Sequence, residues 1–396
     1  CFCRIIIVSC NLKHWLSYLH KHYGKYINAK FPNNVKADIV VVIPCYNELE
    51  LIHTLQSIKT IKKPNANILI AVIINSGIDD NKNILLQNRL TFTEVERFAV
   101  LNNESNLIYF PLLCENLPRK HAGVGLARKI GMDLAIDHFH SNNNNSGVII
   151  SLDADCEVSQ NFFTSINDEF NKNKKLNATI QNFHHRVEND DKDIECAIRQ
   201  YEMYLRYFSK MLKYTGFPYY YHTIGSAFAV SADAYVRVGG MGRQQGGEDF
   251  YFLQKVFQLG HIVELHETYV FPVARFSDRV PFGTGPALQK ILDEPDRKIK
   301  VYSKQSFFYL KSLFEIKDGF FKKDENEITA LMLQLHPALQ NFLTEVNFID
   351  SLNDCNNNCS NLNSYRKRFF HHFNSFKIIK YLNHVHPSPF SFEILN

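Results

Sequence analysis

Several stretches of the chain are apolar at nearly every position and lack the alternation of a half-exposed strand. Buried parallel strands are apolar on both faces, so these stretches predict strands of that kind. They lie at residues 39–43, 68–74, 107–110 and 148–152. Pro44 ends the first stretch abruptly, and Asn75 with Ser76 follows the second.

Helical periodicity appears between the predicted strands and after them. Leu126, Ile130 and Leu134 step by four in a helix expected from Gly123 to Phe139. Other helices are expected from Glu48 to about Lys59 and at 160–171, 192–213 and 248–259. Because strand and helix alternate, the pattern predicts an α/β layered fold whose mostly parallel central sheet is flanked by helices.

Changes in the pattern predict three regions. Residues 1–35 form an N-terminal extension, residues 36–285 form the α/β domain, and residues 286–396 form a helical, Phe-rich C-terminal region. Within the last region, the Asn- and Cys-containing run at 353–361 predicts a flexible loop. The chain does not begin with Met, which leaves open whether a segment precedes residue 1.

Composition narrows the class of protein. Hydrophobic residues make up 45% and charged residues 21% of the chain, as in soluble globular proteins. The net charge of +4 comes without a basic stripe, which argues against a nucleic-acid partner and favours a phosphorylated ligand or an anionic surface. No apolar run near the start is long enough to span a membrane, since the longest is Ile5 to Val8.

Cysteine usage points to a reducing compartment, and we expect a cytoplasmic location. The chain has nine cysteines without regular spacing, and Cys1 and Cys3 have no matching pair of ligands, so no structural zinc site is expected. The basic and aromatic segment at 365–372 has two interpretations, a solvated helix face or a contact with an anionic membrane surface. The first is favoured, and the second stays open.

Two acids follow the predicted strand at 148–152. Asp153 and Asp155 are one residue apart, and ionising both at close range is unfavourable unless a cation lies between them. Mg²⁺ or Mn²⁺ would offset the repulsion and would also bind the oxygens of a diphosphate. A turn with two solvated acids is the alternative for this motif taken alone.

Polar side chains also follow the first two predicted strands. Tyr46, Asn47 and Glu48 follow Pro44, where they could hold a base or a ribose, and Asn75 and Ser76 end the second strand. In a parallel sheet the carboxyl ends of the strands meet at one crevice, where ligands bind. Asn47 has a second interpretation as the N-cap of a helix that starts at Glu48.

Two further groups are candidates for the same crevice. Lys120, Gly125 and Arg128 precede or open a helix, and Arg128 could pair with a phosphate through two hydrogen bonds. Glu248 and Asp249 open the helix at 248–259, where a carboxylate could accept the proton of an acceptor hydroxyl. Their structural alternative is the favourable position of acids in the first turn of a helix.

In this order, the motifs resemble the family 2 glycosyltransferases. The resemblance covers about residues 37 to 285, and the matching pieces are 41–48, 122–128, 152–155, 225–230, 238–241 and 247–249. It implies a GT-A fold for residues 36–285, a nucleotide-sugar donor and a divalent metal. It also implies that Asp155 is the main metal ligand, that Asp153 faces the nucleotide as well as the metal, and that Asp249 is the base of an inverting reaction, with Glu248 beside it.

The sequence departs from that family at some positions. Asn75 stands where many members have an Asp that holds the base, so the identity of the nucleotide is left open. A metal-binding His cannot be assigned, and Arg275 and Arg279 are candidates to meet the diphosphate instead. The acceptor stays open between a saccharide, a lipid-linked acceptor and a small molecule.

Three other functions were weighed against this one. A haloacid-dehalogenase-type phosphatase would have Thr or Val at position 157, two residues after the second Asp, and this chain has Glu there. A nucleotidyltransferase would open with a Gly-rich loop after the first strand, and that loop is missing. A non-catalytic protein of the same fold, which only binds a sugar nucleotide or a partner, remains the main alternative, although it gives the Glu248–Asp249 pair no role.

Overall fold

The computed structural model describes residues 13–26, 28–276 and 283–395. The chain divides into two compact units, each of which is discontinuous in sequence. Unit 1 comprises Cys1–Asn189 and Thr223–Ala274, and unit 2 comprises Asp190–His222 and Arg275–Asn396. The division into three regions expected from the sequence stays a prediction.

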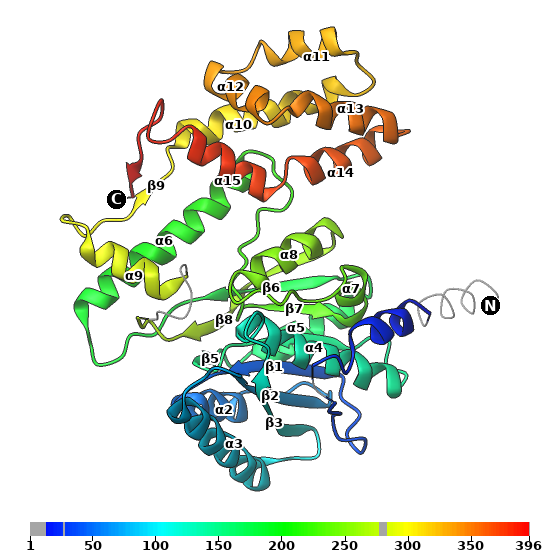
Figure 1. The fold of residues 1–396 in the computed structure, drawn as a ribbon, viewed down its shortest axis with the longest axis vertical. Helices are drawn as coiled ribbons and strands as arrows, with labels where there is room; N and C mark the ends of the chain where they lie inside the picture. The colour runs from blue at the N-terminus through cyan, green and yellow to red at the C-terminus, as the bar shows by residue number, and fades with distance from the viewer. Residues whose placement is uncertain (1–12, 27, 277–282, 396) are drawn as a thin grey trace. The chain divides into compact units, whose positions relative to one another are not determined.

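Unit 1 is built on an eight-stranded sheet, shown in Figure 1. Its strands are β1 (Ile39–Cys45), β2 (Ile68–Gly77), β3 (Leu107–Leu117), β4 (Val148–Ser151), β5 (Cys156–Val158), β6 (Ala178–Phe183), β7 (Phe228–Ser231) and β8 (Ile262–Pro272). The strand order is β3-β2-β1-β4-β7-β6-β8-β5. The first four strands along this order are parallel, whereas β7 runs antiparallel to both of its neighbours. Every residue of β1 and β2 is buried, as their continuous apolar runs predict.

Helices cover both faces of this sheet. The helices α2 (Leu51–Thr60), α3 (Lys82–Asn102) and α5 (Phe162–Lys172) share one hydrophobic cluster with the odd-numbered residues of β1. The helices α4 (Val124–Ser141), α7 (Ala232–Arg237) and α8 (Glu248–Gln258) lie on the opposite face, where Gly131 of α4 meets Val42. The expected α/β fold, a central sheet flanked by helices, is therefore confirmed (Figure 1).

The N-terminal segment is attached to unit 1 by buried polar contacts. Residues 13–22 are helical, and Trp15 and Leu19 are buried. The Tyr18 hydroxyl donates to Asp133 Oδ1 of α4 at 2.6 Å, and Lys129 Nζ lies 2.9 Å from Asp133 Oδ2. Residues 1–12 of the expected extension lie outside the described residues.

Unit 2 is mainly helical, which confirms the expected helical C-terminal region. Its elements are α6 (Lys192–Tyr214), α9 (Thr284–Asp293), β9 (Lys300–Val301), α10 (Lys304–Ile316), η1 (Lys317–Phe320), α11 (Glu325–Met332), α12 (Pro337–Glu345), α13 (Phe348–Asn358), α14 (Leu362–His372), α15 (Ser375–His384) and β10 (Glu393–Ile394). The strands β9 and β10 pair in an antiparallel ribbon. None of the helices in the described parts of the chain has the length and apolar content needed to cross a membrane.

The flexible loop predicted at 353–361 is wrong over most of its length. Helix α13 continues through the Asn-rich run to Asn358, because Phe348, Leu352 and Cys355 form a buried stripe at helical spacing. In the neighbouring basic and aromatic segment, Tyr365 and Phe369 of α14 are buried within unit 2. The aromatic side of this segment therefore packs into the core, and its basic residues face outward.

Candidate functional site

The carboxyl ends of three neighbouring strands form the floor of the candidate site. Strand β1 lies between β2 and β4 and is parallel to both, so the three strands end at the same edge of the sheet. Pro44 lies within β1, opposite Ile73 of β2. The candidate residues 46–48, 75–76 and 153–155 therefore gather at this edge, as the sequence predicts.

The loop after β1 is held by Asp80 and Asn88, two residues that the sequence pattern does not mark as candidates. The Tyr46 hydroxyl donates to Asp80 Oδ1 at 3.0 Å, and Asp80 Oδ2 accepts from the backbone N–H of Gly77 at 2.8 Å. The backbone N–H of Asn47 donates to Asn88 Oδ1 at 2.9 Å. Asp80 and Asn88 lie beyond the end of β2, where no apolar pattern marked them.

The helix predicted to start at Glu48 begins at Leu51, and Asn47 is not its N-cap. Asn47 adopts the left-handed backbone conformation, with φ at 46°. The buried Glu48 carboxylate accepts from the backbone N–H groups of Leu49 and Glu50 at 3.1 and 3.2 Å. Helix α2 has no side-chain cap, and the Glu48 carboxylate instead satisfies two N–H groups of the loop ahead of it.

Asn75 and Ser76 place two buried polar side chains near the end of β2. They are 1% and 0% exposed, and neither the Asn75 amide nor the Ser76 hydroxyl has a hydrogen-bond partner within the described residues. Nearly all buried polar groups in folded proteins are hydrogen-bonded, and an orphan amide is unfavourable by about 1–3 kcal/mol. These two side chains therefore mark a place where a polar ligand would improve the site.

A buried arginine joins the remaining acids of the site. Arg128 of α4 is 2% exposed, and its Nη2 lies 2.5 Å from Asp153 Oδ1. Its Nη1 pairs with Oε1 of Glu248, which is also 2% exposed. Arg128 is a candidate to pair with a phosphate, and in the structure both of its terminal nitrogens contact carboxylates. This guanidinium therefore connects the end of β4 to the start of α8.

Two glycines make this arrangement possible. A Cβ atom at Gly125 would lie 2.2 Å from the carbonyl oxygen of Gln244 and 3.0 Å from Glu248 Cγ. A Cβ atom at Gly225 would lie 2.8 Å from Asp249 Oδ2 and 3.0 Å from Arg128 Nη2. Both positions need glycine because backbone and charged side chains approach closely there.

Burial shifts the pKa values of the acid pair at the start of α8. It raises the pKa of Glu248 to about 7, although Arg128 acts in the opposite direction. Burial also raises the pKa of Asp249, and the positive charge of Arg128 again opposes the shift. Burial lowers the pKa of Arg128, but the carboxylates of Asp153, Glu248 and Asp249 outweigh it, so the guanidinium stays charged.

Asp153 and Asp155 carry the predicted metal site. Both are partly exposed, and the backbone N–H of Cys156 donates to the Asp153 carbonyl oxygen at 3.3 Å. Among the described residues, one group of three His, Cys, Asp or Glu side chains is close enough to hold a metal ion, and it consists of Asp354, Cys355 and His372. Neither Asp153 nor Asp155 belongs to that group. Two carboxylates still fit Mg²⁺ or Mn²⁺, because such ions are commonly held by one or two carboxylates together with substrate phosphates.

The turn before α4 carries the last candidates. Lys120 is exposed there, and the Gln245 side chain ties the turn to the loop before α8 by donating to the carbonyl oxygens of Arg119 and Ala122 at 3.1 Å. Arg279 lies outside the described residues, and Arg275 belongs to unit 2.

No protein-family model matches the chain, and no curated protein does. Among solved structures, S. aureus TarS 1-349 in complex with UDP-GlcNAc is similar at 12% identity and a TM-score of 0.41, over 85% of this chain and 91% of that one. TarS 1-349 in complex with UDP matches over the same shares at 11% identity and a TM-score of 0.39. What those structures bind is a property of TarS, and the side chains described above carry the proposal that follows.

Proposed function

We propose that this chain is a glycosyltransferase that moves a sugar from a nucleoside-diphosphate sugar to an acceptor hydroxyl. One observation carries the proposal, namely the bridge that buried Arg128 makes from Asp153 to Glu248. The bridge joins an acid suited to the donor diphosphate with an acid pair suited to the acceptor. Burying one arginine beside the three carboxylates of Asp153, Glu248 and Asp249 is unfavourable for stability alone, which favours a functional reason for the network.

The donor nucleotide would bind along the ends of β1 and β2. Asn75 offers one donor and one acceptor group, and Ser76 offers a hydroxyl, all buried and without partners within the described residues. A nucleobase or ribose supplies the complementary groups. Tyr46, Asn47 and Glu48 would line the same end, while Lys120 and Gly125 would lie toward the phosphates.

A divalent cation, Mn²⁺ or Mg²⁺, would be held by Asp155 and Asp153. When bound, it would supply charge neutralisation for the departing nucleoside diphosphate. Arg128 orients Asp153 by contacting one of its two carboxylate oxygens. Arg128 is thus a positioning residue, because its own guanidinium is too deeply buried to meet the donor.

Asp249 is the proposed general base. Glu248 is almost fully buried against Arg128, whereas Asp249 is partly exposed and keeps Oδ2 close to Gly225. A carboxylate whose pKa is raised by burial is a stronger base than one in water, provided that it is ionised. A single base that takes the proton of the acceptor hydroxyl corresponds to inversion at the anomeric carbon.

The test is the release of nucleoside diphosphate from UDP-, GDP- and dTDP-sugars with Mn²⁺, using saccharide, lipid-linked and small-molecule acceptors. We expect turnover with one nucleotide class, and Asp249→Asn should reduce it by about a hundredfold or more while donor binding stays. Binding without turnover in the wild type would favour the non-catalytic alternative. The absence of both binding and turnover would contradict the proposal.

A further inference from the structure

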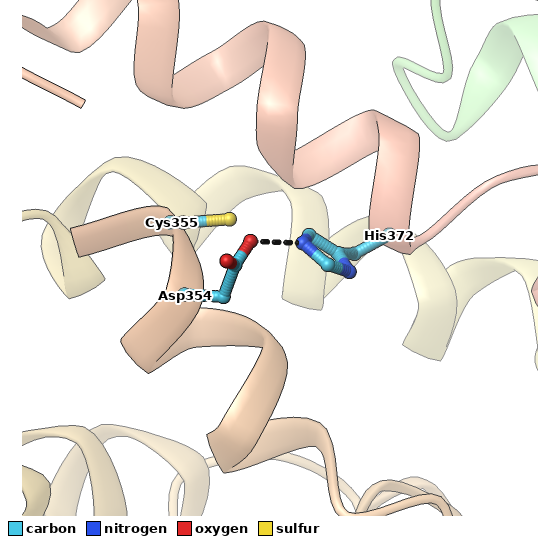
Figure 2. A group of neighbouring side chains, drawn as sticks. All are labelled: Asp354, Cys355 and His372. Carbon is cyan, nitrogen blue, oxygen red and sulfur yellow. Dashed lines mark hydrogen bonds and ion pairs between the residues drawn. The ribbon is translucent and has the colours of Figure 1, made fainter. Parts of the chain in front are cut away.

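A second group of ligand-type side chains lies in unit 2, where α13 and α14 end. Asp354 and Cys355 come from the last turns of α13, and His372 is the last residue of α14 (Figure 2). One ligand atom of each residue lies within 4.8 Å of the other two. The closest pair is His372 Nε2 and Asp354 Oδ2, at 2.6 Å.

Two buried thiols and an orphan hydroxyl adjoin this group. Cys355 and Cys359 are 1% and 5% exposed, and neither forms a disulfide. Burial, with a smaller contribution from the nearby Cys359 thiol, raises the pKa of Cys355 to about 12. The buried Tyr365 hydroxyl has no hydrogen-bond partner among the described residues, and its pKa is raised by burial and, to a smaller extent, by both thiols. The two thiols and the Tyr365 hydroxyl therefore lie near one another, beside Asp354.

We propose that Asp354, Cys355 and His372 bind Zn²⁺, with Cys359 as the fourth ligand. Zn²⁺ takes four ligands from thiolates, imidazoles and carboxylates, and these four residues supply all three kinds. Mg²⁺ and Ca²⁺ prefer oxygen ligands only, so the ion differs in class from the one proposed at Asp155. Binding would displace the thiol protons, because only thiolates ligate metals.

The spacing along the sequence agrees with this assignment. Three residues separate Cys355 from Cys359, and twelve separate Cys359 from His372. These gaps match the first three ligands of the common zinc spacing C-x₂₋₄-C-x₁₂-H. No His follows at the usual fourth position, since Phe376 and Lys377 stand there, and Asp354 is the replacement ligand.

A competing cation already contacts Asp354. Arg368 Nε lies 2.6 Å from Asp354 Oδ2, and Arg368 Nη2 lies 2.9 Å from Oδ1. The Arg368 side chain is 41% exposed and can turn into water. Exposed ion pairs contribute little to stability, so an incoming metal can displace this one. Removing Arg368 should therefore strengthen metal binding, which a purely structural ion pair would not predict.

The experiment is titration of the full-length, chelator-treated protein with Zn²⁺, and with Co²⁺ to detect thiolate ligation by absorption. We expect one ion to be lost in Cys355→Ser and in His372→Ala, with affinity at least about tenfold weaker. Arg368→Ala should bind more tightly. Two control variants should keep the site. The first is Cys196→Ser, which removes an exposed thiol on α6, and the second combines Cys1→Ser, Cys3→Ser and Cys10→Ser.

Three results would overturn the proposal. The first is unchanged Zn²⁺ stoichiometry in folded Cys355→Ser, with folding checked by circular dichroism. The second is weaker or unchanged binding in Arg368→Ala, a surface variant that should fold. The third is a Cys355–Cys359 disulfide that forms equally fast with and without Zn²⁺, because a bound ion would protect both thiols.

Discussion

Arg128 Nη2 lies 2.5 Å from Asp153 Oδ1, and the other terminal nitrogen of the same guanidinium pairs with Glu248. One buried side chain thus fixes the acid after β4 and the acid pair that opens α8. The compact ammonium group of a lysine could not hold both carboxylates as the planar guanidinium of arginine does. Arg128 therefore fixes the position of the proposed donor-binding acid, Asp153, relative to the proposed acceptor-binding acids, Glu248 and Asp249.

Replacing Arg128 with Ala should destabilise unit 1 by about 3–5 kcal/mol, because it leaves buried carboxylates without their partner. Arg128→Lys should fold better but lose most transfer activity. The measurement is urea unfolding together with turnover. Arg89→Ala is the matched control, since Arg89 also contacts one acid, Glu115, through two nitrogens but is exposed. Its effect on stability should be much smaller, because exposed ion pairs contribute little. Equal losses in the two alanine variants would contradict the role of Arg128.

Gly125→Ala should destabilise the protein by about 1–3 kcal/mol and lower activity. The added methyl group would meet the Gln244 carbonyl oxygen at 2.2 Å and push the loop before α8 away from α4. Gly319→Ala serves as the control, because its methyl group would lie 3.5 Å from Leu331 Cδ1, an ordinary contact. Thermal unfolding of both variants decides the matter, and a Gly125→Ala protein as stable as the wild type would show that the close approach is not real.

Asn75→Leu should raise the free energy of unfolding by about 1–3 kcal/mol while it abolishes nucleotide binding. The change removes a buried amide without partners and keeps a similar shape. Asn88→Leu should do the opposite to stability, since the Asn88 side chain accepts from Asn47 N–H and donates to the Asn75 carbonyl oxygen at 2.9 Å. Chemical unfolding of both variants tests this contrast. If Asn75→Leu were destabilised as much as Asn88→Leu, the Asn75 amide would already be satisfied within the protein, which would contradict its proposed role in ligand binding.

Glu248 should make stability depend on pH. Its pKa is raised by burial from 4.5 to about 7, so the folded state binds more protons than the unfolded state between these values. The stability that Glu248 contributes is therefore full below about pH 4.5 and is lost as pH rises through 7. Compared with Glu248→Gln, the wild type should lose stability from pH 5 to 8 in urea unfolding. A wild type that gains stability relative to the variant over this range would reverse the sign of the prediction.

Much of the fold could be predicted because its strands are apolar on both faces and α4 repeats Leu126, Ile130 and Leu134 on one side. Helix α3 was missed because its buried side includes the polar residues Asn88 and Thr91, which weaken the apolar period. Helix α13 was missed because asparagines dominate its last turn, although Cys355 continues its buried stripe. Local propensity loses to tertiary packing in both helices.

The convergence of the candidate residues at one edge of the sheet could be predicted, but their contacts could not. Strand ends converge by topology alone, so Asn75 and Asp153 could be assigned to one crevice. The partners of Arg128 could not, because Glu248 lies 120 positions away and reaches Arg128 only when α8 packs beside α4. The Asp354, Cys355 and His372 group could not be predicted either, since Asp354 and Cys355 lie in the run interpreted as a loop and His372 comes from the separate segment at 365–372.

The central claim is that Asp153 and Asp155 hold a cation that neutralises a nucleoside diphosphate. The most direct measurement is the thermal shift of the protein with UDP, GDP and dTDP, with and without Mn²⁺. A ligand at a hundred times its dissociation constant stabilises by about 2.7 kcal/mol. We predict a shift with one nucleotide that needs Mn²⁺, disappears in Asp155→Ala, and survives in Glu157→Gln, whose carboxylate pairs with Arg186 at 3.0 Å. A shift that persists without Mn²⁺ or in Asp155→Ala would contradict the claim.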